Sequence, residues 1–421
     1  MEIAVENITH KFTKAVESNF TSGIFSHEAR EEAKSLLENN RFPNTRDEYW
    51  KYTRLNRIST KNFLIQPANI QSIDLFNVSD LNSIKIVFVN GFFSAQFSDF
   101  TDFKTNGIDV FSKGDFRPKV AHSASEIFDQ LNTCFATDGI RLHIGKNIKI
   151  EPTIEIIHIQ TGTEVIANLY HEITIEPNAQ AEVVMSFYSQ EALQCFTNVR
   201  SSVELKDGAH LSITKLQAED NNNYHIATEN INQGANSNFT INTITLGGEL
   251  LRNNLNIAVN GQNCETNLNA AYILKENQHV DNHTLVDHRV ANCLSNELYK
   301  GVMNDKSTAV FNGKVFVRKD AQKINAFQSN GNVLLSNDAT VNSKPELEIY
   351  ADDVKCSHGS TTGQLDENAV FYLRSRGMSE KQARELLVQA FIGDVLSKLS
   401  DPLRFKVDQI LEDKFGWEFL S

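Results

Sequence analysis

Lys206-Asp-Gly-Ala-His210 is one of four short polar turns that recur through the middle of the chain at a nearly constant spacing. The four are Glu176-Pro-Asn-Ala-Gln180, Lys206-Asp-Gly-Ala-His210, Gln233-Gly-Ala-Asn-Ser237 and Asn260-Gly-Gln-Asn-Cys264, with starts 30, 27 and 27 residues apart. Short runs rich in β-branched residues lie between them, and long helical segments are missing. Repeats of this length are typical of a solenoid, in which each repeat stacks on the next.

A β-sandwich or a barrel is the competing interpretation, because both also place short strands between regularly spaced turns. The residues alone leave these folds open. The β-rich character extends over residues 146–357. The chain is therefore expected to divide into a helical and mixed N-terminal region (1–145), this β core, and a helical C-terminal region (358–421).

Elements of the N-terminal region can be predicted from the spacing of apolar residues. Alanine and leucine recur at helical intervals over residues 27–39. A strand that ends in a turn is expected at 85–91, and a second short helix at 124–136.

The C-terminal region is predicted to hold a helical hairpin over residues 366–399. Asp366 is the expected N-cap of the first helix, and Gly377 its expected end. Ser379-Glu-Lys-Gln382 has the pattern of a capping box that opens the second helix. The expected apolar stripe of that helix is Ala383, Leu386, Leu387, Ala390, Phe391 and Val395.

Composition excludes several classes of protein. The 421 residues carry a net charge of −13, which argues against a general nucleic-acid binder. No apolar run reaches the ~18 residues of a membrane span, and no basic and apolar leader opens the chain. The five cysteines are far apart and form no Cys-x-x-Cys pair, so we expect a reduced, cytoplasmic protein without disulfides.

Cys356 and His358 form the only Cys-x-His pair of the chain. In an extended segment these two side chains project from the same face. A thiolate beside an imidazole suits iron or zinc, but two ligands cannot complete a metal site, so further ligands would have to come from elsewhere or from another chain. From spacing alone, a buried cysteine and a surface histidine at a domain junction is the commoner outcome.

His279, His283 and His288 are a second candidate cluster, with Asp281 and Asp287 among them. In a strand the three histidines are not all in phase, so the spacing is weak support for a metal site. Polar pairing within or between coils is the favoured interpretation, because buried polar groups rarely lack partners.

A longer set of motifs gives the chain a family resemblance, strongest over residues 270–400. The motifs are Val280-Asp-Asn-His-Thr-Leu-Val-Asp-His288, Tyr299-Lys-Gly-Val302, Ala309-Val-Phe-Asn-Gly313, Ala321-Gln322, Lys344 through Asp366, and Phe371-Tyr-Leu-Arg-Ser-Arg-Gly377, with a weaker one at Arg46-Asp-Glu-Tyr-Trp-Lys-Tyr-Thr53. Together they resemble the SufB/SufD family of iron–sulfur cluster assembly scaffolds. The chain is similar to the SufD branch, because SufB-like chains carry an essential cysteine near the position of Ala339.

The resemblance implies a right-handed parallel β-helix core flanked by helical regions. It also implies a non-catalytic scaffold that pairs with a SufB-like chain, while a chain alone could form a homodimer. Cys356 and His358 would then lie at the scaffold interface, near a transient iron–sulfur cluster or iron shared with the partner and not held tightly by this chain alone. The C-terminal helices would bind the ABC-type ATPase SufC, with Phe371, Leu386, Leu387 and Phe391 as the expected contacts.

Enzyme activity is not expected. The chain has neither the Gly-x-x-x-x-Gly-Lys-Ser/Thr loop of an ATPase nor the Gly-x-Ser-x-Gly turn of a serine hydrolase. A DNA-binding helix-turn-helix is a poor match for residues 366–398, which carry five basic and five acidic side chains. The alternatives that stay open are a β-helix carbohydrate-active enzyme and a simple protein-interaction module.

Overall fold

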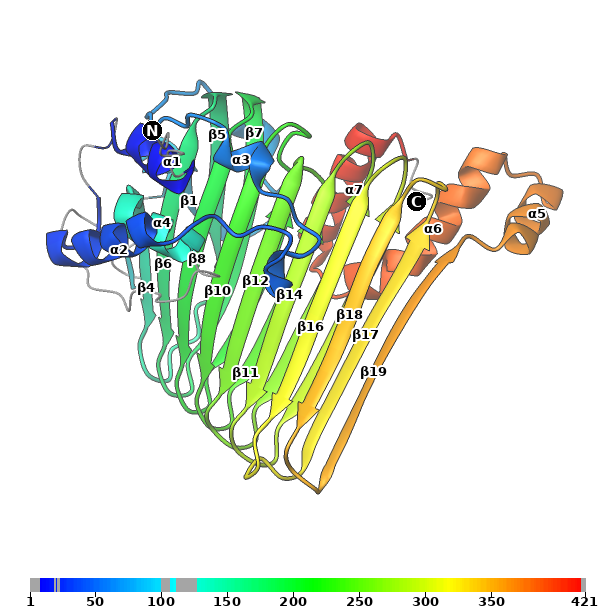
Figure 1. Ribbon diagram of the computed structural model, residues 1–421. Helices are drawn as coiled ribbons and strands as arrows, with labels where there is room; N and C mark the ends of the chain where they lie inside the picture. The colour runs from blue at the N-terminus through cyan, green and yellow to red at the C-terminus, as the bar shows by residue number, and fades with distance from the viewer. Residues whose placement is uncertain (1–7, 19, 21–22, 100–106, 111–126, 418–421) are drawn as a thin grey trace, which may run out of the picture.

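The chain winds into a solenoid whose coils each add one strand to two parallel sheets (Figure 1). The computed structural model describes residues 8–18, 20, 23–99, 107–110 and 127–417. From β4 onward, successive strands alternate between a nine-stranded and a ten-stranded sheet, and the solenoid has about eight turns. This parallel β-helix with helices at both ends of the sequence confirms the predicted fold class.

The strands of the ten-stranded sheet are β1 (Ser83–Val89), β2 (Phe92–Phe93), β5 (Thr153–Thr163), β7 (Gln180–Leu193), β9 (His210–Gln217), β11 (Asn238–Thr245), β13 (Glu265–Leu274), β15 (Leu294–Met303), β17 (Ile324–Leu334) and β19 (Val354–Gln364). Those of the nine-stranded sheet are β3 (Ile108–Val110), β4 (Asp138–Ile144), β6 (Ile166–Ile175), β8 (Phe196–Leu205), β10 (Tyr224–Gln233), β12 (Leu250–Val259), β14 (His279–His288), β16 (Thr308–Val317) and β18 (Thr340–Ile349). The first coils are closed by β2 and β3, which run antiparallel to β1 and β4.

The four predicted turns all lie at the same corner of the solenoid, where a strand of the nine-stranded sheet passes into the ten-stranded sheet. Each turn contains one residue with positive φ: Asn178, Gly208, Asn236 and Asn263. Glycine and asparagine tolerate this left-handed conformation better than other residues. The recurring Asn and Gly of the sequence therefore mark the position at which each coil bends.

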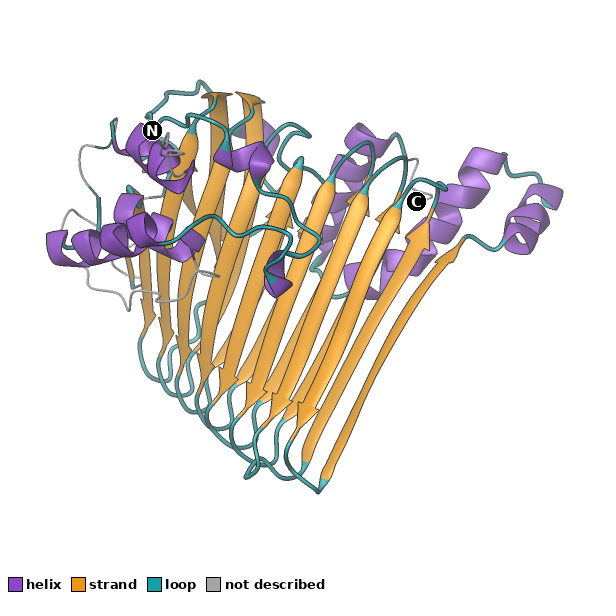
Figure 2. Ribbon diagram, viewed as in Figure 1, coloured by secondary structure: helices purple, strands orange, loops and turns teal. Residues whose placement is uncertain are grey.

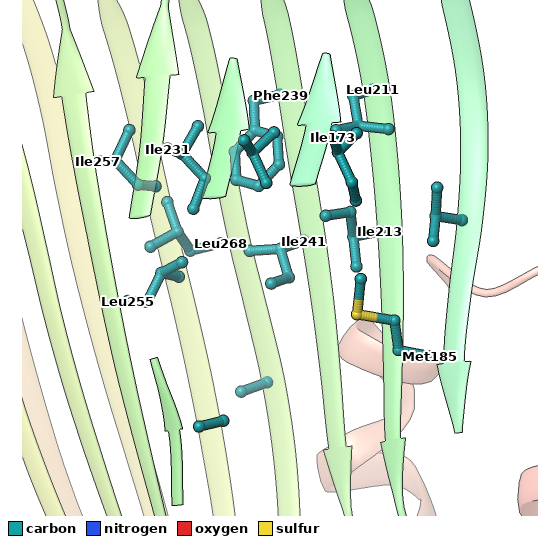
Figure 3. Close-up of a cluster of buried hydrophobic side chains, with 14 of the residues drawn as sticks. Ile173, Met185, Leu211, Ile213, Ile231, Phe239, Ile241, Leu255, Ile257 and Leu268 are labelled. Atoms are coloured by element: carbon teal, nitrogen blue, oxygen red, sulfur yellow. The ribbon is translucent and has the colours of Figure 1, made fainter. Parts of the chain in front are cut away.

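The interior of the coils is filled by apolar side chains that stack in register from strand to strand. Ile213, Ile241 and Leu268 occupy one such column, on β9, β11 and β13 (Figure 3). Leu211 and Phe239 form the next column, and all five side chains are buried. Because each coil presents its apolar face to the coils on both sides, no coil can bury that face alone.

Helices cover the outer faces of the two sheets (Figure 2). The N-terminal helices pack on the nine-stranded sheet, and the last two helices pack on the ten-stranded sheet. The helices are α1 (Ile8–Glu17), α2 (His27–Asn39), α3 (Asn56–Ser59), α4 (Ile127–Phe135), α5 (Glu367–Ser375), α6 (Glu380–Leu396) and α7 (Asp401–Phe415), with 3₁₀ turns at Glu48–Trp50 and Asp74–Phe76.

The N-terminal predictions can be compared with these elements. The helix over 27–39 and the strand at 85–91 are confirmed as α2 and β1, and α4 confirms the second helix from 127 onward, while residues 124–126 lie outside the described part. Strands β1 and β4, which precede residue 146, belong to the two sheets of the solenoid. The expected boundary at residue 357 falls inside β19.

Candidate functional site at the open end of the solenoid

The last coil of the solenoid leaves an open end. β18 pairs with β16, β19 pairs with β17, and within the described part of the chain no strand pairs with their other edges. Most of β19 is exposed, and β18 is half-buried along most of its length. Figure 1 shows β19 at one end of the stack, opposite the end where β4 lies. Such an edge presents unpaired backbone N–H and C=O groups to any strand that can add to it.

Cys356 and His358 lie on this last strand. Cys356 pairs in register with Ala326, and His358 with Gln328, both of which are buried inside the preceding coil. Residues in register on parallel strands share a face, so both side chains lie on the end surface of the solenoid core. The extended strand therefore places the two side chains on one face, as their spacing predicts.

The two side chains differ in their surroundings. Cys356 is half-buried and packs against the interior apolar cluster, whereas His358 is exposed. Partial burial raises the pKa of the Cys356 thiol, opposed by a backbone hydrogen bond at Ala326. The thiol is thus protonated at neutral pH, and a metal ion or a nearby positive charge would be needed to stabilise the thiolate. Within the described residues, no three His, Cys, Asp or Glu side chains converge on one metal position.

Polar side chains fill the core directly behind His358. Gln328 Nε2 donates to Glu297 Oε2 over 2.8 Å, and Thr284 Oγ1 donates to Glu297 Oε1 over 2.6 Å. Burial raises the pKa of Glu297 to about 7, although both hydrogen bonds favour its charged form. The Oε1 atom of Gln328 is buried and has no partner among the described residues. The column Glu297–Gln328–His358 therefore leads from the interior to the end surface.

A second polar chain reaches the same surface through Asn330. Its Nδ2 donates to Tyr272 Oη over 3.0 Å, and its Oδ1 accepts from Ser343 over 2.8 Å. Ser360 of the last strand then donates to Ser343 over 2.8 Å. Sequence reasoning missed these residues. The signal was present in β17, where Gln328, Asn330 and Asn332 alternate in phase with buried Ile324 and Ala326.

A buried ion pair joins the N-terminal segment to the solenoid. Arg252 Nη1 lies 2.7 Å from Asp281 Oδ2, and the guanidinium stacks 3.8 Å from the ring of Trp50. Thr53 Oγ1 donates to the same Asp281 oxygen over 2.5 Å, and Arg252 Nη1 also donates to the Tyr49 carbonyl oxygen over 2.7 Å. This cluster of Trp50, Thr53, Arg252 and Asp281 is called the anchor below. The anchor joins the motif at residues 46–53 to the motif at residues 280–288, which lie more than two hundred residues apart in the sequence.

Each of the three histidines of β14 contacts a polar side chain. His283 Nε2 lies 2.9 Å from Asp281 Oδ1, and His279 Nε2 lies 2.9 Å from Thr53 Oγ1. His288 faces the opposite side of the strand and contacts Ser295 Oγ at 2.9 Å. Burial lowers the pKa of all three histidines, that of His288 to about 4. The predicted polar pairing within or between coils is confirmed for His283 and His288, whereas His279 pairs with the N-terminal segment. The prediction that the three are not in phase is confirmed.

A cavity of about 240 Å³ opens beside the anchor, on the outer face of the nine-stranded sheet. Its wall includes Tyr49 and Phe128 from the N-terminal region, and Arg252, His283 and Lys314 from the solenoid. The cavity therefore depends on the docking of the N-terminal segment onto the strands.

The C-terminal hairpin has the predicted ends. Asp366 caps α5 by accepting from the Asn368 backbone N–H, and Ser379 and Gln382 form the capping box of α6. Gly377, with φ +98°, lies in the left-handed region between the two helices. Phe371 on α5 is 72% exposed, so this helix presents a large apolar side chain to solvent.

The predicted apolar stripe of α6 is wrong in part. Ala383 and Val395 are buried as expected, but Ala390 is exposed, and Val388 and Ile392 are buried in its place. Apolar residues occur around most of this helix, so spacing alone could not select the buried face. Leu386 and Leu387 are half-buried. Phe391 packs partly against the ten-stranded sheet, where Lys300 Nζ lies 5.0 Å from its ring centre.

Comparison with known proteins places the chain in a family. The family model described as the SUF system FeS cluster assembly, SufBD core domain, matches residues 158–391, and the SufBD protein N-terminal region model matches residues 10–156. The chain belongs to the SufBD family. It is 32% identical over 397 residues to an iron–sulfur cluster assembly SufBD family protein of Synechocystis, covering 88% of this chain and 86% of that protein.

Further relatives agree with this assignment. The chain is 31% identical over 382 residues to the iron–sulfur cluster assembly protein SufD of Escherichia coli, covering 89% of each chain. It is 27% identical over 398 residues to the chloroplastic protein ABCI7 of Arabidopsis thaliana, covering 88% of this chain and 82% of that one. Because this last relative is named chloroplastic, the cytoplasmic setting of the present chain stays a prediction.

The two SufBD models divide the structure in an informative way. Trp50 and Thr53 lie in the N-terminal model, and Arg252 and Asp281 lie in the core model, so the anchor joins the two parts of the SufBD chain. Cys356 and His358 also lie in the core model, which ends at Phe391 within α6. Among the described residues of this SufBD protein, no helix combines the length and apolar character that a membrane crossing requires.

Proposed function

We propose that this SufBD protein is a non-catalytic scaffold subunit for iron–sulfur cluster assembly, which pairs through its open end with a SufB-like scaffold. The observation that carries the proposal is the unpaired edge of β19, whose end surface bears Cys356 and His358. Strand addition to this edge would satisfy its backbone groups and cover the half-buried Cys356. The carbohydrate-enzyme alternative has no support from either family model.

In this proposal the nascent cluster or its iron is cargo and not a resident cofactor. The Cys356 thiolate and the His358 imidazole offer one sulfur and one nitrogen ligand, which iron accepts. Two ligands leave the coordination incomplete, so the partner scaffold supplies the others. The cargo would therefore be held only while the two scaffolds are joined.

Co-expression with candidate SufB-like and ATPase partners tests the assembly. We expect native mass spectrometry under anaerobic conditions to show one copy of each scaffold with two ATPases. A chain that remains a monomer or homodimer beside folded partners would contradict the proposal and favour a different interaction module.

Replacement of Cys356 by serine together with His358 by alanine is expected to leave this assembly intact and to lower its cluster content at least severalfold. Iron and sulfide content and visible absorbance after anaerobic reconstitution measure the effect. Lys355→Ala and Ser357→Ala are matched controls, because these neighbours on β19 face the other side of the strand. A double variant that assembles and reaches wild-type cluster content would refute the role of the two ligands.

The hairpin of α5 and α6 is the proposed docking site for the SufC-like ATPase. Phe371 is the sharpest probe, because its side chain is largely exposed and its loss leaves no cavity. Phe391 is a poorer probe, since its backbone and ring contact Lys300 of the solenoid.

Phe371→Asp is expected to weaken ATPase binding tenfold or more, because buried aromatic side chains often dominate an interface. Titration calorimetry with the isolated ATPase measures the change. Phe405→Asp, at an exposed phenylalanine on α7, is the matched control and should bind normally. If both variants bind the ATPase equally well, α5 is not the docking site.

A further inference from the structure

Cys264 and Cys293 occupy the same position in two successive coils. Each precedes the first residue of its strand, and those first residues, Glu265 and Leu294, are paired in register. The equivalent position holds Ala179, Ala209 and Ser237 in the three earlier coils and Ile324 in the next. The two cysteines are thus stacked neighbours in an inward-facing column at the corner of the solenoid.

The two sulfur atoms are held together by shared contacts. Cys264 Sγ lies 3.1 Å from the Gly261 carbonyl oxygen, and Cys293 Sγ lies 3.4 Å from the same oxygen. The two thiols are also close enough to shift each other's pKa. Neighbouring strands lie about 4.8 Å apart, which is within the range of Cα separations found across disulfides. Backbone geometry and side-chain direction therefore both suit a covalent bond between these atoms.

The pKa values of the two thiols shift in opposite directions. The neighbouring Cys293 thiol lowers the pKa of the Cys264 thiol, against the effect of burial. Ser237 Oγ lies 3.5 Å from Cys264 Sγ. The neighbouring Cys264 thiol and burial raise the pKa of Cys293. We therefore assign the attacking role to Cys264 and the resolving role to Cys293, and the single substitutions below test this assignment.

We propose that Cys264 and Cys293 form a peroxide-sensitive dithiol, which oxidises to a disulfide joining adjacent coils. Both residues are only 2% exposed, so the oxidant must be small, and hydrogen peroxide is little larger than water. The Cys264 thiolate attacks one peroxide oxygen and releases hydroxide, which gives a sulfenic acid. Cys293 then attacks the Cys264 sulfur, which forms the S–S bond and releases water. Two thiols and one peroxide thus give one disulfide and two waters.

This modification would fasten two coils that otherwise adhere only through hydrogen bonds and packing. A cross-link between residues 264 and 293 closes a loop of about one coil and restricts the unfolded chain. The oxidised protein is therefore more resistant to unfolding than the reduced protein. The inference does not rest on the proposed scaffold function, since neither cysteine lies on the end surface.

The full chain, treated with hydrogen peroxide and then blocked with a thiol reagent under denaturing conditions, provides the test. Non-reducing peptide mapping by mass spectrometry is expected to show the Cys264–Cys293 linked peptide as the main oxidised product. The thermal midpoint should rise by roughly a few degrees and return after reduction. Cysteines that stay reduced at a dose that oxidises Cys356, or that over-oxidise without linking, would overturn the proposal.

Single substitutions distinguish the two sulfur roles. Cys293→Ser should accumulate a dimedone-reactive sulfenic acid at Cys264, whereas Cys264→Ala should leave Cys293 reduced. Both replacements are residues that the same column already holds in earlier coils, at Ser237 and Ala209, so the fold should tolerate them. If either variant unfolds, the peptide mapping and the thermal midpoint of the oxidised wild-type protein still test whether the disulfide forms.

Discussion

Replacing Asp281 by alanine is expected to lower the free energy of unfolding by about 3–5 kcal/mol. Arg252 and Asp281 are 3% and 1% exposed, so the substitution would leave a buried guanidinium without its counter-charge. Burial alone would raise the pKa of Asp281, but the charges of Arg252 and His283 hold it well below its usual range. The carboxylate is therefore charged throughout the neutral range, and its loss also frees Thr53 and His283.

Equilibrium urea unfolding at pH 7, followed by circular dichroism, measures this loss. Asp287→Ala is the matched control, because Asp287 lies on the same face of β14 and also pairs with arginines. Those partners, Arg289 and Arg318, are 46% and 52% exposed, so water can solvate them after the substitution. The control should lose about 1 kcal/mol or less. If both variants lose the same stability, the buried Arg252–Asp281 pair contributes no more to the free energy of unfolding than the partly exposed pairs of Asp287.

Replacing Glu297 by glutamine is expected to stabilise the protein at pH 8, by on the order of 3 kcal/mol. Burial raises the pKa of Glu297 from 4.5 to about 7 in the folded protein. Between these pH values the folded chain keeps a proton that the unfolded chain has lost, so rising pH lowers the stability of the wild type. The stability of the variant does not fall in this way, because its amide side chain does not ionise.

The difference in free energy of unfolding between this variant and the wild type should depend on pH. The difference between variant and wild type should vanish near pH 4.5, grow between pH 4.5 and 7, and stay constant above pH 7. Glutamine can keep both hydrogen bonds, since the unpartnered Oε1 of Gln328 can turn to accept from the new amide. Glu412→Gln, on the exposed side of α7, is the control for pH effects elsewhere. A difference that does not vary with pH would assign the effect to packing instead of charge.

Local sequence signals were sufficient to predict the coil corners and the helix ends. The turn residues Asn178, Gly208 and Asn236 are needed for positive φ, and that requirement is visible in the sequence. Asp366 and Ser379 satisfy backbone groups within three residues of themselves, so their capping could also be predicted.

Non-local pairing limited what the sequence could show of the candidate site. Thr53 and Asp281 meet only because the N-terminal segment crosses the outer face of β14, which no local pattern specifies. The polar interior at Glu297 and Gln328 contradicts the usual assignment of apolar residues to the inside of a strand. Whether Cys356 and His358 bind iron depends on a second chain, and that role stays a prediction.

The closed beginning and the open end of the solenoid give the stack of coils a direction. Strands β2 and β3 run antiparallel to β1 and β4, so no further parallel coil precedes the first one within the described residues. Each later coil pairs its strands with the strand edges of the coil before it. β19 has no such successor among the described residues, so the last coil keeps the unpaired edge with which every earlier coil holds the next one.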